Sequence, residues 1–229
     1  MGDHLNKIFE QYKNKFSGET AVLIGGGPTI DHFVPIKEAT IYVGVNFIGK
    51  HKLFNQELDN YIMLDYYFFG DSGRHMDKTF KVKGKKFAAC IVNGAFHRKH
   101  VSLKEAEALG ACGMEICNKR PLLDGQYLPK SFHNDIANNL VYGHTVVMAA
   151  LQFLVYAGVS KIYLVGMDCE GTVCFNDIPI INSPGGYDGM TKDWDNAKKW
   201  LDEEHSEIEI ISVNPRGLKG YFKDLFQND

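Results

Sequence analysis

Three glycines, a proline and a threonine at residues 25–29 form the part of the sequence best suited to binding a phosphate. The segment follows an apolar run at residues 21–24 that is typical of a buried strand. Glycines let the backbone approach a ligand closely, and a helix that starts at the proline would direct its N–H groups at an anion. The sixth position is Ile30, so the pattern is neither a Gly-x-Gly-x-x-Gly fingerprint nor a Walker loop. We predict that a nucleotide phosphate binds here, the alternative being a simple strand-to-helix turn. The residues involved are Gly25, Gly26, Gly27, Pro28 and Thr29.

Polar side chains stand directly after three further predicted strands. Asn46 follows residues 41–45, Asp65 follows residues 61–64, and Asp168 comes shortly after residues 161–165. In open α/β sheets, ligands bind beyond the carboxyl ends of the strands. We therefore expect Asn46 to contact the nucleoside, Asp65 to contribute to nucleotide binding, and Asp168 to be essential for catalysis. A strand-end aspartate can also simply cap a turn.

Two further sites are weaker. Gly143, His144 and Thr145 precede a predicted helix and provide either a second anion site or a helix cap. Asp168 and Glu170 resemble an oxygen-ligand pair for a divalent cation, which makes Mg²⁺ a candidate cofactor.

The elements that must position these residues alternate between strands and helices. Apolar strands are predicted at residues 21–24, 41–45, 61–64, 87–92, 161–165 and 209–213, and helices at 3–16, 102–109, 145–157 and 191–204. This order predicts a mostly parallel sheet covered on both faces, within a single domain of residues 1–229. Residues 93–142 fit no simple unit, and we expect them to form an insertion or lid.

Composition narrows the function classes. The chain has 229 residues, 45% of them hydrophobic, and a formal net charge of −3, which gives no support to a nucleic-acid partner. No apolar run is long enough to span a bilayer, and no signal peptide is visible. The five cysteines are irregularly spaced, as in reduced cytoplasmic proteins, so we expect a cytoplasmic protein. A homo-oligomer is compatible with the sequence.

Four segments in fixed order resemble one known superfamily. It joins the sialyltransferases of glycosyltransferase family 42 with the 6-hydroxymethylpterin diphosphokinase-like (DUF115) proteins. The segments are Ile24–Ile30, Val45–Phe47, Gly143–Thr145 and Lys161–Asp168. The resemblance implies a Rossmann-like three-layer α/β sandwich that holds a nucleotide on the glycine loop, with Asn46 against the nucleotide.

The chain departs from the sialyltransferases at the proposed base. Their His-Tyr-x-Gly-His segment corresponds to residues 186–190, where Tyr187 and Gly189 match but Met190 replaces the final histidine. A thioether cannot accept the proton of a sugar hydroxyl. Asp188, His144 or Asp168 would have to substitute.

The sequence therefore predicts a nucleotide-dependent transferase. Its leading form is a glycosyltransferase that moves a sugar from a nucleotide-sugar donor to a glycan or small-molecule acceptor. The alternatives are an Mg²⁺-dependent diphosphokinase-like enzyme that uses ATP, and a non-catalytic nucleotide-binding module.

Overall fold

The chain forms an eight-stranded, fully parallel sheet. The computed structural model describes residues 5–46, 48, 51, 65–70, 84–90, 103–108, 110–115, 132–137, 140, 145–170 and 186–227. The strand order is β5-β4-β3-β2-β1-β6-β7-β8, and every neighbouring pair is parallel. The strands are β1 (Thr20–Ile24), β2 (Ile41–Val45), β3 (Asp65–Gly70), β4 (Lys85–Cys90), β5 (Cys112–Glu115), β6 (Lys161–Val165), β7 (Glu209–Val213) and β8 (Lys223–Leu225).

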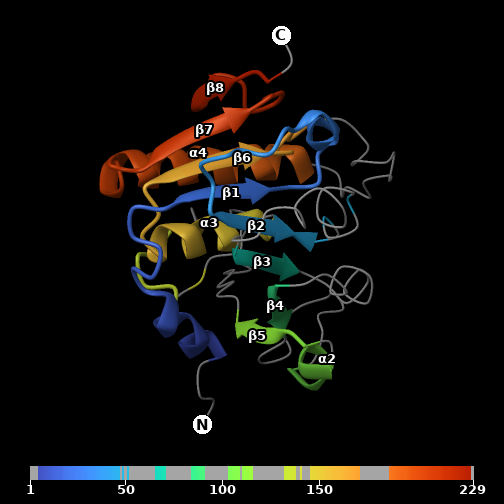
Figure 1. Ribbon diagram of the computed structural model, residues 1–229, viewed down its shortest axis with the longest axis vertical. Helices are drawn as coiled ribbons and strands as arrows, with labels where there is room; N and C mark the ends of the chain where they lie inside the picture. Colours follow the sequence, from blue (N-terminus) through green and yellow to red (C-terminus); the bar gives the residue numbers. More distant parts are fainter. Residues whose placement is uncertain are drawn as a thin grey trace, which may run out of the picture.

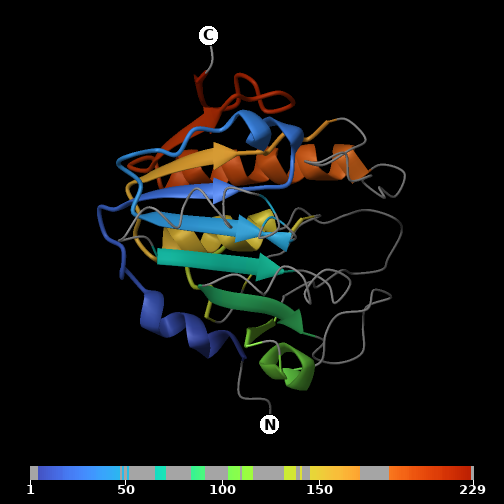
Figure 2. The ribbon, with the colours of Figure 1, turned by 45° about the vertical axis from the view of Figure 1, so that its right-hand side comes forward.

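The chain winds through this sheet in two directions from its centre. Strands β1 to β5 are added towards one edge, and β6 to β8 towards the other, so the winding reverses between β1 and β6. Figures 1 and 2 show the strands side by side in this order, with β8 and β5 at opposite ends of the molecule. In a doubly wound sheet, the reversal opens a crevice beyond the carboxyl ends of the two central strands.

Both faces of the central strands are buried. In β1, Ala21 and Leu23 pack in the large core with α3 (Val147–Tyr156), while Val22 and Ile24 are equally buried on the opposite side. Because successive side chains of a strand point to opposite faces, this pattern requires a layer on each side of the sheet. The fold is therefore the Rossmann-like α/β architecture expected from the sequence.

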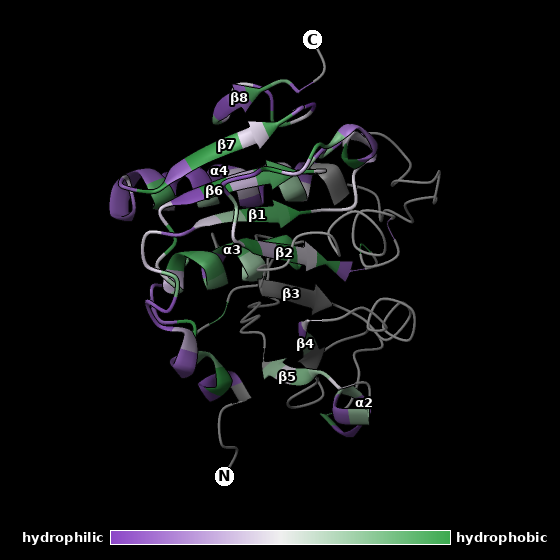
Figure 3. Cartoon of the chain, in the orientation of Figure 1, coloured by the Kyte–Doolittle hydropathy of each residue, from purple (hydrophilic) through white to green (hydrophobic). Residues whose placement is uncertain are grey.

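One face carries α3, α4 (Gly186–Glu204) and the 3₁₀ helix η1 (Leu5–Tyr12). All ten residues of α3 are buried, whereas α4 is amphipathic and buries Trp194, Ala197, Trp200 and Leu201. Figure 3 shows this contrast as an apolar α3 beside an α4 and an η1 of mixed hydropathy. The other face carries the short 3₁₀ helix η2 (Pro28–His32) and the chain up to β2.

Several predicted boundaries were right. The strands at 41–45, 161–165 and 209–213 have the predicted bounds. Strand β1 begins one residue before its predicted start at residue 21, and β4 begins two residues before its predicted start at residue 87. Helix α2 (Leu103–Ala108) lies within its predicted segment. Of the helix expected at residues 3–16, the structure forms η1, and the chain then turns at Asn14, whose φ is +55°.

Two predicted segments are described by the structure only in part. The third strand runs over Asp65–Gly70, while residues 61–64 lie outside the described residues. The aromatic run after Asp65 suits a strand as well as the aliphatic run before it, so local pattern alone did not fix the boundary. Residues 112–115, expected in an insertion or lid, form strand β5 and pair with β4. The other parts of 93–142 that the structure describes are α2 and residues 110–111, 132–137 and 140. Among the described helices, none combines the length and apolarity that a bilayer crossing requires.

Candidate functional site

The glycine turn after β1 lies directly against the turn after β6. The Gly25 N–H donates to the Val165 carbonyl, and the Gly27 N–H donates to the Gly166 carbonyl, each over 2.8 Å. These two bonds extend the β1–β6 ladder past the ends of both strands. Two N–H groups predicted to face a phosphate are thus used to join the turns at the point where the sheet reverses.

Glycine is required here because the two turns approach so closely. A Cβ atom at Gly27 would lie 2.3 Å from Asp168 Oδ2 and 2.7 Å from the Gly166 oxygen. A Cβ at Gly25 would lie 2.6 Å from the same carbonyl oxygen. Real Cβ atoms do not come this close, so any larger residue at either position must displace the β6 turn. Gly166 itself has a φ of +63°, a conformation that side chains disfavour.

Asp168 and Thr29 meet across this junction. Thr29 Oγ1 donates to Asp168 Oδ1 over 2.6 Å, and the Thr29 N–H donates to Asp168 Oδ2 over 3.0 Å. Gly27, the N-cap residue of η2, has no side chain to cap the helix, so the carboxylate of Asp168 satisfies the first turn from another strand. The structure therefore brings two sequence-predicted site residues, 139 positions apart, into direct contact.

The Asp168 carboxyl is buried in an environment that disfavours its charge. The residue is 4% exposed, and burial raises the pKa of its carboxyl above the ordinary value. The two hydrogen bonds from Thr29 and the charge of Arg216 oppose this effect without cancelling it. A carboxyl with a raised pKa at a strand end is the kind of group that exchanges protons in catalysis.

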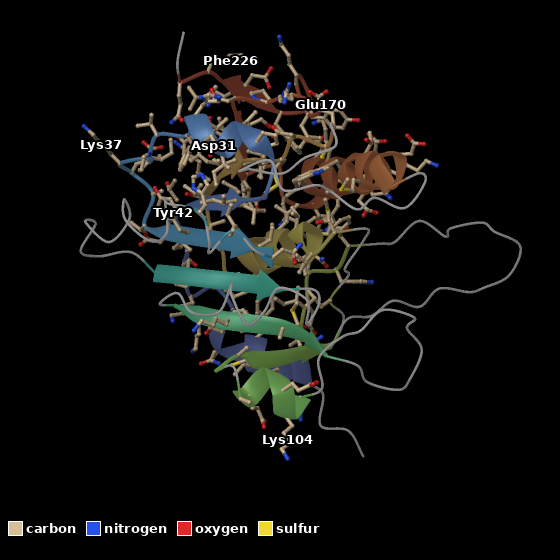
Figure 4. The ribbon with its side chains drawn as sticks, turned by 90° about the vertical axis from the view of Figure 1, so that its right-hand side faces the viewer. Asp31, Lys37, Tyr42, Lys104, Glu170 and Phe226 are labelled. Carbon is tan, nitrogen blue, oxygen red and sulfur yellow. The ribbon has the colours of Figure 1, made fainter. Side chains whose placement is uncertain are left out.

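A third loop, after β7, completes the junction and was missed in the sequence. The Gly217 N–H donates to the Asp168 carbonyl over 2.8 Å, and a Cβ at Gly217 would lie 2.4 Å from that oxygen. Arg216 Nε lies 3.1 Å from Glu170 Oε1. Glu170 is labelled in the upper part of Figure 4, which views the side of the molecule that lies to the right in Figure 1. Applying the strand-end rule to residues 209–213 would have drawn attention to Asn214–Gly217. We refer to residues 25–31, 166–170 and 214–217 as the switch-point loops.

The predicted metal pair does not converge in this arrangement. Asp168 directs its carboxylate at Thr29, and Glu170 directs its own at Arg216. Within the part of the chain that the structure describes, no three acidic, histidine or cysteine side chains gather around a common point. An Mg²⁺ site at Asp168 and Glu170 stays a prediction, because the two carboxylates point to different partners.

Asn46 lies at the carboxyl ends of the strands, and Asp65 lies at their amino ends. Asn46 follows β2 at the carboxyl edge, where its backbone takes a φ of +53°. Nearby, His51 Nε2 lies 2.9 Å from Asp31 Oδ1, which ties the segment after β2 to η2, and Asp31 is labelled in Figure 4. Asp65 is the first residue of β3 and pairs with Ile41, the first residue of β2. The prediction that Asp65 ends a strand was wrong, because β3 starts there; the residue stands at the amino edge, away from the switch-point loops.

The structure describes some of the residues of the second predicted anion site, 143–145, and of the segment that corresponds to the sialyltransferase base, 186–190. Thr145 lies just before α3, and its Oγ1 accepts from the Val147 N–H over 3.4 Å, as a helix-capping residue does. Gly143 and His144 lie outside the described residues. Tyr187 and Asp188 belong to the first turn of α4, which follows β6 and so begins at the carboxyl edge; Asp188 is exposed. Between described residues, no hydrogen bond or ion pair joins Thr145 or Asp188 to Asp168.

Cys169 is unsuited to be a nucleophile. Burial raises the pKa of its thiol to about 12, although a hydrogen bond with Trp194 acts in the opposite direction. The reactive thiolate is therefore scarce at neutral pH. Its φ of +50° turns the chain after Asp168 towards the loop that follows β7.

Comparisons with known proteins give one distant likeness. No family model matches the chain, and no curated protein matches it. Two solved structures of the sialyltransferase CstII from Campylobacter jejuni align with a TM-score of 0.41, one with the substrate analogue CMP-3FNeuAc and one with cytidine-5'-monophosphate. They are 10% and 9% identical to the chain, and each alignment covers 90% of this chain and 85% of the other. At this distance the likeness carries no functional argument, and the diphosphokinase-like branch is not among the matches.

Proposed function

We propose that this chain is a nucleotide-sugar-dependent glycosyltransferase whose site lies at the switch-point loops. The observation that carries the proposal is the contact of Thr29 with Asp168 at the reversal point of the sheet. It joins a side-chain-free turn, suited to a phosphate, with a buried carboxyl suited to proton transfer. The resemblance of the glycine loop and of residues 161–168 to the sialyltransferase superfamily agrees with this reading.

The turn would hold the donor phosphate. Gly25 and Gly27 use their N–H groups within the junction, and Thr29 directs its N–H and hydroxyl at Asp168, so the phosphate would bind at Gly26. The absence of a side chain at Gly26 would let a phosphate approach the backbone. Asn46, at the end of the neighbouring strand β2, would contact the nucleoside.

Asp168 would act as the base. In the transfer step, the oxygen of the acceptor hydroxyl forms a bond to the anomeric carbon of the sugar, and the bond from that carbon to the phosphate oxygen breaks. The nucleotide phosphate leaves with the bonding electron pair, and Asp168 takes the proton of the hydroxyl. Each Asp168 oxygen accepts one hydrogen bond from Thr29 and retains a lone pair for this role. Asp168 would thus supply the base that the thioether of Met190 cannot.

Ligand binding tests the proposal directly. A thermal-shift screen compares CMP, UDP, GDP and ATP, and their sugar conjugates where these exist, with and without Mg²⁺. A ligand at about 100 times its dissociation constant adds roughly 2.7 kcal/mol to the stability of the folded protein. Stabilisation by a nucleotide-sugar without Mg²⁺, followed by transfer to an acceptor, supports a glycosyltransferase.

Three other outcomes would contradict the proposal. Stabilisation by ATP only with Mg²⁺ would favour the diphosphokinase-like alternative. Nucleotide binding without turnover of any donor would favour a non-catalytic module. If none of the nucleotides stabilises the protein, the prediction that it binds a nucleotide is wrong.

A further inference from the structure

Arg216 lies in the loop after β7 that borders the proposed phosphate site. Within the switch-point loops, it is the only lysine or arginine; the acidic residues there are Asp31, Asp168 and Glu170. A phosphate that enters this crevice therefore meets three carboxyl groups and one guanidinium. Without a contribution from Arg216, the local charge would oppose the binding of any anion.

The backbone holds Arg216 at this position. Its neighbour Gly217 donates an N–H to the Asp168 carbonyl, and the absence of a Cβ at Gly217 permits the approach. The charge of Arg216 acts on the Asp168 carboxyl, which places the guanidinium within electrostatic reach of the site. The loop after β7 thus fixes where the side chain begins, while the side chain itself is half exposed, at 51%.

Glu170 pairs with Arg216 at the protein surface. The ion pair joins Nε to Glu170 Oε1 at 3.1 Å, and the glutamate is also about half exposed, at 49%. Among the described residues, no other group accepts a hydrogen bond from Arg216. Exposed ion pairs of this kind contribute little to stability, so a competing anion can replace the glutamate. A phosphate with two negative charges accepts two parallel hydrogen bonds from an arginine and competes well with a single carboxylate oxygen.

We infer that Arg216 binds the phosphate group of the nucleotide, and that Glu170 competes with this phosphate for the guanidinium. The inference deepens the proposed function and rests on it for the identity of the nucleotide. It identifies the ligand chemistry as a phosphate or diphosphate rather than an uncharged nucleoside. It also assigns Glu170 a regulatory contact: the glutamate holds Arg216 in the unliganded protein and lowers the affinity for the anion.

Four variants test the inference by thermal shift and calorimetry. The probes are inorganic pyrophosphate and, for the base selected by the nucleotide screen, the nucleoside, its monophosphate and its diphosphate. Arg216→Gln should weaken binding of the phosphate-bearing probes tenfold or more and leave nucleoside binding unchanged. Arg216→Lys should recover part of the loss, because it restores the charge without the paired donors. Glu170→Gln should tighten binding two- to fivefold, and this gain should vanish in the double variant with Arg216→Gln.

Lys199→Gln is the matched control. It removes the same charge and also breaks an exposed ion pair, that of Lys199 with Glu203, but it lies in the last turns of α4, towards the amino edge of the sheet. Its affinities should equal those of the unaltered protein.

The two proposals fail in different ways. Equal losses for the nucleoside and the diphosphate in Arg216→Gln, or none for either, would overturn the role of Arg216 and leave nucleotide binding intact. Pyrophosphate binding that depends on Arg216, without binding of any nucleotide, would support the anion site and contradict the proposed function. If pyrophosphate and every nucleotide fail to bind the unaltered protein, both proposals are wrong.

Discussion

The pKa values of carboxyl groups are shifted in opposite directions at the two ends of strand β6. At the amino end, Lys161 pairs with Glu38 and Glu209, over 3.1 and 3.3 Å. Hydrogen bonds from Tyr163 and Lys161 lower the pKa of Glu38, and those from Lys223 and Lys161 lower the pKa of Glu209. At the carboxyl end, burial raises the pKa of Asp168 although Thr29 donates two hydrogen bonds to it. One end therefore stabilises charge, and the other keeps a carboxyl in an environment that disfavours its charge.

The difference shows how to separate structural from functional carboxyl groups in this fold. The amino-end acids are exposed and accept hydrogen bonds from cations, so they remain ionised at neutral pH and contribute modestly to stability. Asp168 is buried at the reversal of the sheet, where solvent cannot fully satisfy its charge. The predictions below test this distinction, starting with the variant expected to have the largest effect.

Asp168→Asn should abolish most of the activity without unfolding the protein. We expect the transfer rate to fall by a factor of about 10² to 10⁴, the usual contribution of a general base. The amide can still accept from the Thr29 N–H and donate to the Thr29 hydroxyl. Steady-state kinetics with the donor chosen by the nucleotide screen measure the loss. A rate within a factor of about three of the unaltered protein would assign Asp168 to capping alone.

The same variant makes a prediction about stability. Because the folded-state pKa of Asp168 is raised, its contribution to stability is fully present below the unfolded pKa and is lost as pH rises through the folded value. Asparagine does not ionise, so its burial does not become less favourable as pH rises. The stability of Asp168→Asn relative to the unaltered protein should therefore increase as pH rises above about 4. Urea titrations at pH 3.5 and pH 7 give the comparison. A variant that is less stable only at pH 7 would contradict the raised pKa.

Gly27→Ala should disrupt the junction between the turns. The new Cβ would lie 2.3 Å from Asp168 Oδ2, so the carboxylate or the turn must move. Overpacking of this kind costs roughly 1–3 kcal/mol, and we expect nucleotide affinity to fall with it. Denaturation and ligand titration measure the two effects.

Gly110→Ala is the control for that loss of stability. Gly110 has a φ of +68° and open space around it, so alanine there costs backbone strain of about 1–2 kcal/mol without touching the junction. Its nucleotide affinity should be unchanged. Equal loss of affinity in both glycine variants would mean that stability, and not the geometry of the turn, controls binding.

Thr29→Val should shift the pH dependence of the reaction. The variant loses the hydroxyl that donates to Asp168 Oδ1, a bond that lowers the pKa of this carboxyl. The pKa should therefore rise further, and the acidic limb of the rate profile should move to higher pH, because a base acts in its deprotonated form. Thr29→Ser keeps the donor and should retain the original profile. If the acidic limb of the pH–rate profile does not move in Thr29→Val, the pKa that controls the rate does not belong to Asp168.

Lys161→Met should have the smallest effect. It removes two ion pairs at the amino end of β6, and exposed pairs of this kind contribute little to stability. The lowered pKa values of Glu38 and Glu209 contribute stability above their ordinary value of 4.5, and that stability is lost as pH falls through the folded values. The difference from the unaltered protein should thus disappear at acid pH, while the transfer rate stays constant. A change in rate would contradict a purely structural amino end.

The sequence by itself determined the order of the elements and the chemistry of the best candidates. Buried strands such as residues 41–45 and 161–165 are recognisable in the sequence as apolar runs, because a strand covered on both faces has no polar side. The glycine turn and Asp168 were both identifiable, because each directly or closely follows such a run. The family resemblance used the same segments.

Only the tertiary structure decided how these segments meet. Strand β8 has three residues and β5 four, and such short edge strands carry too little local pattern to be recognised. The start of β3 at Asp65 depends on its pairing with β2, and this register placed a predicted site residue at the wrong edge. The reason for the glycines at positions 25 and 27 also lies in a partner segment: their missing side chains leave room for Gly166 and Asp168, some 140 residues away. Such a close approach is fixed by the parallel pairing of β1 with β6, because the pairing aligns their carboxyl ends and so brings the two turns together.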